Sequence, residues 1–230
     1  MADYWTWAEI KAKVEKDLDL EGETFIPEDE LLGYANEAIR EVSRQIHTLY
    51  DDYFLTRSTI TLASGTEEYS LPSDIYAMKV RGLVYRNGTN VWPIKRLKDW
   101  RKFEEYEFNK SNADTTSQYN YIIVNSTVGS PKILFTPTPN ESGAYVRIWY
   151  IRNANELTLA TSICDIPEAV NYVMQYMKVR CYEKEGHPNL QKALLDLAEE
   201  KKETLGVLAT LVPDNDNILE MDTSTYEEMS

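Results

Sequence analysis

The sequence predicts an α+β protein: a four-helix bundle built from both chain ends, with an inserted antiparallel β domain and an extended C-terminal tail. Apolar residues recur every three or four positions, the helical period, in residues 1–52 and 153–212, whereas residues 53–152 alternate with the period of two that strands show. Net charge follows a similar division. It is −7 for residues 1–50, +2 for residues 51–152 and −9 for residues 153–230. We expect the β domain to be a small sandwich or barrel.

Two helices are expected in the N-terminal zone. The first carries an apolar stripe on one face, formed by Trp7, Ile10, Val14 and Leu18. The second begins at Pro27, because proline is tolerated in the first turn of a helix. The acids that follow it, residues 28–30, suit the positive end of the helix dipole. We expect this second helix to run to about Tyr50.

Two more helices are expected in the C-terminal zone. Asp165 and Glu168 have the spacing of a capping box, which marks a helix start. This helix should end at Gly186, since glycine is favoured just past a helix C-terminus. The last helix should begin near Pro188 and stop before Pro213, because proline cannot continue a helix.

The middle zone is expected to contain about six strands, with a short extended piece and one short helix over residues 98–108. Asn87-Gly88 between two alternating stretches is a strong signal for a tight hairpin. The expected strands and the extended piece cover residues 53–62, 69–74, 77–86, 90–97, 119–125, 132–136 and 144–152. We therefore divide the chain into residues 1–52, 53–152, 153–212 and a tail.

Composition excludes several classes of protein. A chain of 230 residues with 11% aromatic residues is long enough to bury a core, so disorder throughout is excluded. A net charge of −14 disfavours general binding to nucleic acid or anionic membranes. We expect no secretory signal, no membrane span, and no disulfide between the two cysteines.

Catalytic and metal-binding patterns are lacking in the sequence. His47 and His187 do not have the spacing of a metal pair, and each is expected to be a plain surface or capping residue. Cys164 and Cys181 are expected to pack as small apolar side chains. No phosphate-binding loop, dinucleotide fingerprint or nucleophile elbow is present. The sequence thus predicts no enzyme, no cofactor and no metal site.

A run of cations is the one pattern that points to a binding surface. Only Asp99 opposes it within the same window, and Trp92 and Trp100 lie among its members. The cations are Lys79, Arg81, Arg86, Lys95, Arg96, Lys98, Arg101 and Lys102. In an acidic chain, we expect this set to contact an acidic surface of another copy or of a partner. Two alternatives stay open: binding of nucleic acid, with aromatic residues stacking on bases, and strand side chains that face water.

The C-terminal segment, residues 213–230, has six acids and neither lysine nor arginine. Such a tail can simply be a solvated extension. Apolar residues scattered through it favour a tail that orders against a partner instead. The residues expected to make this contact are Asp214, Asp216, Ile218, Leu219, Met221 and Tyr226.

The order of the segments resembles the head-to-tail adaptor (connector) proteins of tailed bacteriophages. The resemblance covers nearly the whole chain, and its most telling piece is Tyr-Ser-Leu-Pro-Ser-Asp at residues 69–74, followed by a strand. Its other pieces are the second helix with its flanks (27–55), the strand Ile148-Trp-Tyr-Ile-Arg152 with Asn155-Glu-Leu-Thr158, and the helix pair broken at Gly186-His-Pro188.

The resemblance implies a structural virion protein without catalytic residues. Such adaptors form a twelve-fold ring beneath the portal, at the junction of head and tail. The expected partners are the portal protein, tail or nozzle proteins and other copies of the chain. Packaged DNA would pass through the ring without specific binding, and no membrane is involved. The alternatives are a nucleic-acid-binding module that uses the cations, and an interaction protein that forms no ring.

Overall fold

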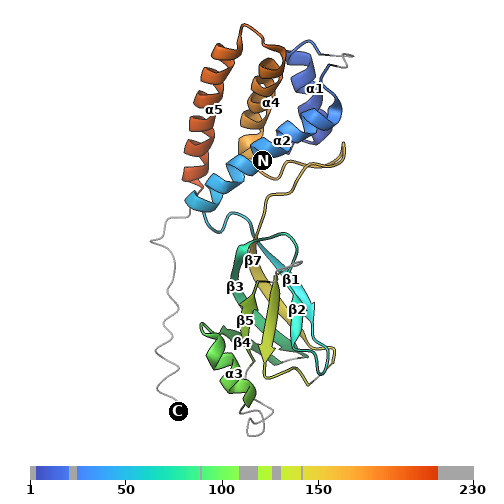
Figure 1. Ribbon diagram of the computed structural model, residues 1–230, viewed down its shortest axis with the longest axis vertical. Coiled ribbons are helices and arrows are strands. Elements are labelled where there is room, and N and C mark those ends of the chain that lie inside the picture. The colour runs from blue at the N-terminus through green and yellow to red at the C-terminus, as the bar shows by residue number, and fades with distance from the viewer. Residues whose placement is uncertain are drawn as a thin grey trace. The chain divides into compact units, whose positions relative to one another are not determined.

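The chain divides into two compact units, one helical and one built on strands (Figure 1). The helical unit comprises residues 1–50 and 156–230, and the β unit comprises residues 51–155. The computed structural model describes residues 4–20, 25–88, 90–108, 119–125, 131–140 and 142–211. The predicted α+β class is confirmed.

Helix α4 is the central element of the helical unit. It spans Val170–Glu185 and contacts α1 (Trp7–Asp17), α2 (Glu28–Leu49) and α5 (Leu190–Thr210). The buried residues of α4 are Val170, Tyr172, Val173, Met174, Met177, Val179 and Cys181; Tyr172 and Val179 lie off the stripe that the other five form. A helix that is covered by neighbours on several sides needs more than one apolar stripe, which explains the additional buried residues.

The helix ends that the sequence predicts are confirmed in two places and wrong in one. Pro27 is the N-cap of α2, and Gly186 ends α4 in the left-handed conformation with φ 66°, both as expected. The expected capping box at Asp165 is wrong, because α4 is preceded by a short 3₁₀ turn, Pro167–Ala169, whose N-cap is Ile166. A capping box does occur on α1, where the Thr6 hydroxyl accepts from the Glu9 backbone and the Glu9 carboxylate accepts from the Thr6 N–H.

The β unit contains a single curled sheet in the order β1-β7-β3-β4-β5-β6-β2. The helix α3 (Trp100–Phe108) lies between β4 and β5 in the sequence. The strands are β1 (Leu55–Thr61), β2 (Glu68–Ser70), β3 (Ile75–Asn87), β4 (Asn90–Arg96), β5 (Asn120–Val124), β6 (Lys132–Thr136) and β7 (Tyr145–Arg152). One curled sheet, with β1 and β2 at the ends of its order, replaces the expected sandwich or barrel.

The pairing is mixed, which corrects the expected antiparallel arrangement. Strands β4 and β5 pair in parallel, Lys95 with Asn120 and Arg96 with Tyr121, while the other ladders are antiparallel. A parallel pair needs a long connection, and the 23 residues between Arg96 and Asn120, including α3, provide one. The predicted hairpin is confirmed, because Asn87 pairs with Asn90 and Gly88 has φ 56°.

A hydrophobic core lies against one face of this sheet. Ile133, Phe135, Val146 and Ile148 are fully buried in it and come from β6 and β7. Alternate residues of these strands face the core, which is the period of two that the sequence shows. Residues 213–230, including all six tail residues singled out above, lie outside the described part of the chain.

Candidate interaction surfaces

The predicted cation run separates into two groups in the structure. Lys79 and Arg81 of β3 pair with acids that directly follow α2 in the sequence. Lys79 Nζ lies 2.5 Å from Asp51 Oδ1, and Arg81 Nε lies 2.7 Å from Asp52 Oδ1; Arg81 also contacts Asp51. The hydrogen bond from Lys79, together with Arg81, lowers the pKa of Asp51. These two cations are therefore largely engaged within the β unit.

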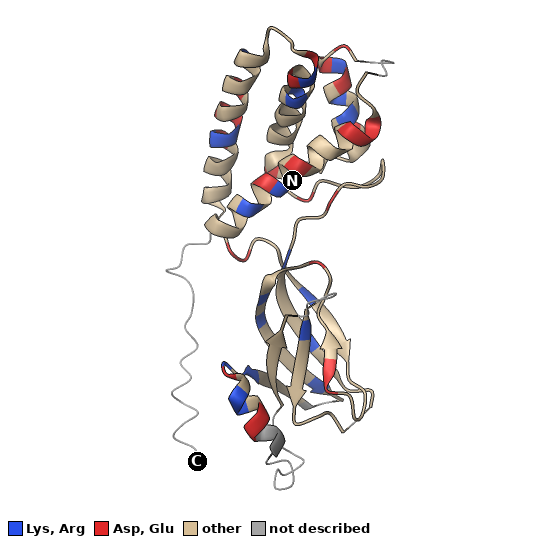
Figure 2. Ribbon diagram, viewed as in Figure 1, with Lys and Arg blue, Asp and Glu red and all other residues tan. Residues whose placement is uncertain are grey.

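Most of the other predicted cations are exposed. Arg86 of β3 is half-buried, while the rest lie on β4, on α3 and in the turn between them (Figure 2). The five exposed residues, here termed the exposed cation set, are Lys95, Arg96, Lys98, Arg101 and Lys102. Trp100 lies among them with 63% of its side chain exposed, and the Arg101 guanidinium lies 5.8 Å from the centre of its ring. An exposed tryptophan beside cations is typical of a surface that meets a partner.

A hollow of about 520 Å³ opens in the β unit beside β3. Its lining combines cations, one carboxylate, one amide and apolar side chains. The residues are Asp51, Ala77, Met78, Lys79, Val80, Arg81, Arg96, Ile123 and Asn125. Ala77 and Met78 have φ of 46° and 55°, in the left-handed region that residues with a Cβ seldom adopt. Strain of this kind tends to be kept at functional sites.

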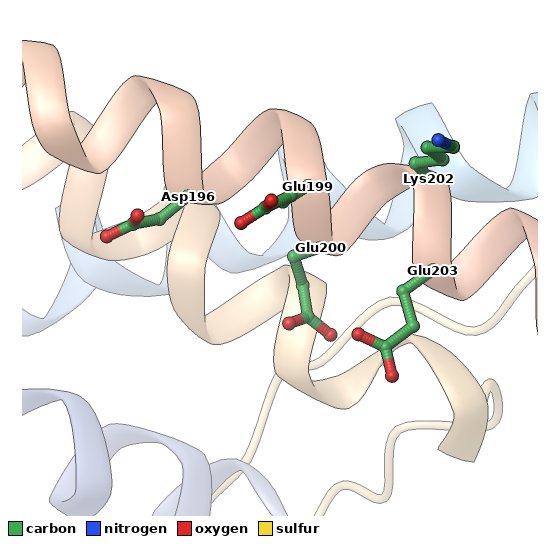
Figure 3. Close-up of a pocket in the computed structure, with 5 residues that line it drawn as sticks. All are labelled: Asp196, Glu199, Glu200, Lys202 and Glu203. Carbon is green, nitrogen blue, oxygen red and sulfur yellow. The ribbon is translucent and has the colours of Figure 1, made fainter.

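The outer surface of α5 is acidic on one side. A hollow of about 550 Å³ is lined by Asp196, Glu199, Glu200, Lys202 and Glu203, and Figure 3 shows that all five project from α5. Partial burial, reinforced by the nearby Glu203 carboxylate, raises the pKa of Glu200. A cationic partner would relieve this repulsion.

The same helix exposes apolar side chains. Leu195 is 72% exposed, and Leu194, Val207 and Leu211 are exposed as well. Only Ala193, Thr204 and Leu208 of α5 are buried in the helical unit. A 21-residue helix with this little buried surface is typical of an element that another molecule covers.

The histidines and cysteines do not form a reactive group. His47 lies in the last turn of α2, and it is buried rather than on the surface. Both cysteines are buried, and burial raises the pKa of Cys164 to about 11 and that of Cys181 to about 12, so both remain protonated thiols. Within the described ranges, no group of three or more His, Cys, Asp or Glu side chains is arranged to hold a metal ion.

Two polar contacts escaped the sequence analysis. The Tyr150 hydroxyl donates to Asp74 Oδ1 at 2.9 Å, and Asn36 hydrogen-bonds the backbone of Leu157 at both ends of its amide. Asn36 is a polar residue among the apolar residues of α2. This exception to the apolar pattern is visible in the sequence and could have marked Asn36 as a buried hydrogen-bonding residue. Across the residues that the structure describes, no helix has the length and apolar composition needed to cross a membrane.

Exposed charged residues lie on both units and exposed apolar residues lie on α5, and such surfaces are typical of proteins that bind other proteins. The comparison with known families makes this more specific. The family model of the SU10 adaptor protein matches residues 5–217, which include described elements of both units. The chain belongs to the SU10 adaptor protein family and is a bacteriophage structural adaptor, as the resemblance implied. No curated protein matches it.

Proposed function

We propose that this protein is a virion component that joins the phage head to the tail, as a ring of about twelve copies under the portal. The ring would line the channel for DNA and form the platform to which the tail or nozzle attaches. The observation that carries this proposal is the adaptor family match over residues 5–217. No catalytic role is proposed, because an adaptor acts through its surfaces.

The two charged surfaces support assembly from identical copies. The exposed cation set lies on the β unit, and the acids Asp196, Glu199, Glu200 and Glu203 lie on α5. A contact between unlike patches of two copies repeats around a ring and closes when the rotation allows. We propose that these surfaces meet between neighbours, with Arg86 at the edge of the contact and Lys79 and Arg81 turned to their internal partners.

We further propose that α1, α2, α4 and α5 act as one four-helix bundle, drawn from residues 1–52 and 153–212, that carries the β unit of residues 53–152. The acidic tail, residues 213–230, would order against the portal or an adjacent copy. Its anchors would be Ile218, Leu219, Met221 and Tyr226, because ordering a free segment costs about 1 kcal/mol or more per residue and needs apolar contacts to offset it.

Mass measurement of the portal-bound protein tests the proposal. We expect the chain, mixed with the portal protein of its own phage, to add about twelve copies per complex. The chain alone can remain a monomer, since many interfaces are completed by the partner. A one-to-one complex, or no binding to the portal, would contradict the proposed function.

A second candidate function is binding of nucleic acid. The observation that favours it is the exposed Trp100 among the five exposed cations, since bases stack on aromatic side chains while cations bind phosphates. The net charge of −14 argues against it, because the rest of the surface repels phosphate. The charge-reversal experiment described in the Discussion separates the two functions.

A further inference from the structure

The curled sheet of the β unit has an unfilled strand position. Strand β4 pairs with β3 over Leu83–Asn87 and with β5 at Lys95 and Arg96, and then it ends. Past that point β3 continues back to Ile75 and β5 continues forward to Val124. Because β4 is antiparallel to β3 and parallel to β5, both of these stretches extend beyond the end of β4. No described strand lies between them.

The hollow of about 520 Å³ marks this position. It is lined by residues of β3 on one side, by Arg96 at the end of β4, and by Ile123 and Asn125 on the side of β5. The strand position between β3 and β5 is therefore open to an extended segment that enters from outside. We refer to it as the β3–β5 slot.

The backbone of β5 offers hydrogen bonds in this slot. The Tyr121 carbonyl accepts from the Leu97 N–H at 2.8 Å, so Tyr121 directs its peptide groups toward β4. Peptide groups of alternate residues point to the same side of a strand, so the N–H and C=O of Ile123 face the slot. Within the described chain, Ile123 has no strand partner on that side. An added strand would satisfy these groups, which is the mode of recognition known as β-augmentation.

The side chains around the slot define the chemistry of its occupant. Three cations line the slot, but Lys79 and Arg81 are already paired with Asp51 and Asp52. Arg96 is therefore the lining cation that is left to meet a carboxylate of the occupant. Arg96 forms no ion pair with any described residue. Met78, Val80 and Ile123 add an apolar lining. The site suits an extended peptide that alternates carboxylates with apolar side chains.

The C-terminal segment of this chain follows that pattern in part. From residue 216 to 222, the even positions hold three acids, Asp216, Glu220 and Asp222, together with Ile218, and the odd positions hold Asn217, Leu219 and Met221. Side chains of an extended segment alternate between two faces, so all three acids fall on one face, and Leu219 and Met221 fall on the other. Residues 213–230 as a whole carry six negative charges and no positive one.

We propose that residues 216–223 of a neighbouring copy add as a strand in the β3–β5 slot, beside β5. The adjacency of copies rests on the ring assembly proposed above. A segment passed from each copy to the next makes the same contact at every interface, which is the arrangement a closed ring needs. The neighbouring copy, rather than the portal, is then the receptor of the acidic tail.

Disulfide capture in the full chain tests this proposal. A chain that carries both Glu220→Cys and Asn125→Cys should form reducible covalent dimers and larger species under mild oxidation. At high protein concentration, we expect these species both with and without the portal protein. Cys164 and Cys181 are buried and stay protonated, so they do not compete. The matched control combines Glu220→Cys with Thr59→Cys, an exposed residue of β1 that does not line the slot. Equal capture in both pairs would overturn the proposal, as would exclusively intramolecular bonds or capture of the portal alone.

Charge reversal supplies a second readout with the same cysteine pair. Arg96→Glu should slow capture by about tenfold or more, because it places a carboxylate against the acids of the segment. Arg57→Glu is the control, since Arg57 is an exposed cation of β1 that neither lines the slot nor belongs to the exposed cation set. Similar effects of the two changes would contradict the slot.

The result is separable from the test of the proposed function. If rings form on the portal but the Glu220→Cys and Asn125→Cys pair is captured no more than the control pair, the slot is rejected and the adaptor function still stands. Specific capture between copies that never load onto a portal would keep the slot and reject the adaptor ring.

Discussion

A single amide side chain joins helix α2 to the segment that follows the β strands. Asn36 donates from Nδ2 to the Leu157 carbonyl at 2.9 Å and accepts from the Leu157 N–H at 2.8 Å. The side chain is buried, so water has little access to replace these hydrogen bonds. The two hydrogen bonds therefore satisfy two backbone groups that would otherwise be buried without partners.

We predict that Asn36→Ala lowers the free energy of unfolding by about 2–4 kcal/mol, since each backbone group left unpaired costs about 1–3 kcal/mol. Denaturant unfolding followed by circular dichroism measures the change. Ser43→Ala is the control, because the Ser43 hydroxyl donates only to Arg40 within the same helix. A loss no larger than that of the control would show that the Leu157 backbone finds other partners.

The residue scale also shows where sequence reasoning ends. The sequence shows that Asn36 is a polar residue on an apolar helix face. It does not show the partner of Asn36, because Leu157 lies 121 residues away. The partner of Lys79 was not visible in the sequence either. We expect Lys79 in an intermolecular patch from the sequence, but in the structure it pairs with Asp51, 28 residues earlier. Ion pairs between side chains that the fold brings together have no periodic signal, so they could not be predicted.

At the scale of elements, β3 is the strand that departs most from regular geometry. Its pairing with β7 shifts register twice, between Ile75 and Val80 and again between Val80 and Gly82. Ala77 and Met78 fall in the first shift with positive φ, although neither is glycine. A left-handed residue with a Cβ costs about 1–2 kcal/mol, so this bulge persists because the surrounding sheet holds it.

We predict that Ala77→Gly raises the free energy of unfolding of the β unit by about 1 kcal/mol, because glycine adopts φ 46° without a steric cost. Ala63→Gly should lower it by up to about 1 kcal/mol, since Ala63 is exposed and lacks a positive φ. Denaturant titrations of both variants measure the changes. If Ala77→Gly destabilised the β unit like the control, the bulge would not be strained.

The elements that were predicted correctly are those with local signals. The helical period predicted α1, α2, α4 and α5, and Asn87-Gly88 predicted the β3–β4 hairpin. The parallel pairing of β4 with β5 was missed, because only the long connection through α3 makes it possible and its path is set by packing of α3 against β5 and β6. The unfilled strand position follows from that missed pairing, so the sequence could not reveal the slot.

At the scale of the whole molecule, opposite charges lie on different units. The exposed cation set belongs to the β unit, and the acids around Glu200 belong to the helical unit. A chain with both surfaces can contact copies of itself, whereas a surface for DNA alone would need no acidic counterpart. Assembly and DNA binding therefore predict different responses to the loss of the cations.

We predict that Lys98→Glu, Arg101→Glu and Lys102→Glu together impair assembly on the portal and leave the fold intact. All three residues are exposed, and none forms an ion pair with another described residue. The reversal removes one contact at the surface, that of Arg101 with the exposed Trp100 ring, and no contact in the core. Arg81 is left unchanged, because a glutamate there would face Asp51 and Asp52 and destabilise the β unit itself. The matched control reverses three exposed cations elsewhere on the chain that form no ion pair with a described residue, Lys16, Arg44 and Lys192, to give the same net charge.

The physical reason is repulsion between like charges at the interface. Glutamates on the β4–α3 surface would oppose the acids of α5, and each such pair weakens association in a way that salt screens. We therefore expect fewer copies per portal in mass measurements, with partial recovery as the ionic strength rises. Adding Asp196→Lys, Glu199→Lys and Glu203→Lys in the same chain should restore the copy number, because it restores opposite charges. If the triple reversal instead leaves the copy number unchanged but abolishes retention on DNA by the pure protein, the cations serve nucleic acid and not the neighbouring copy.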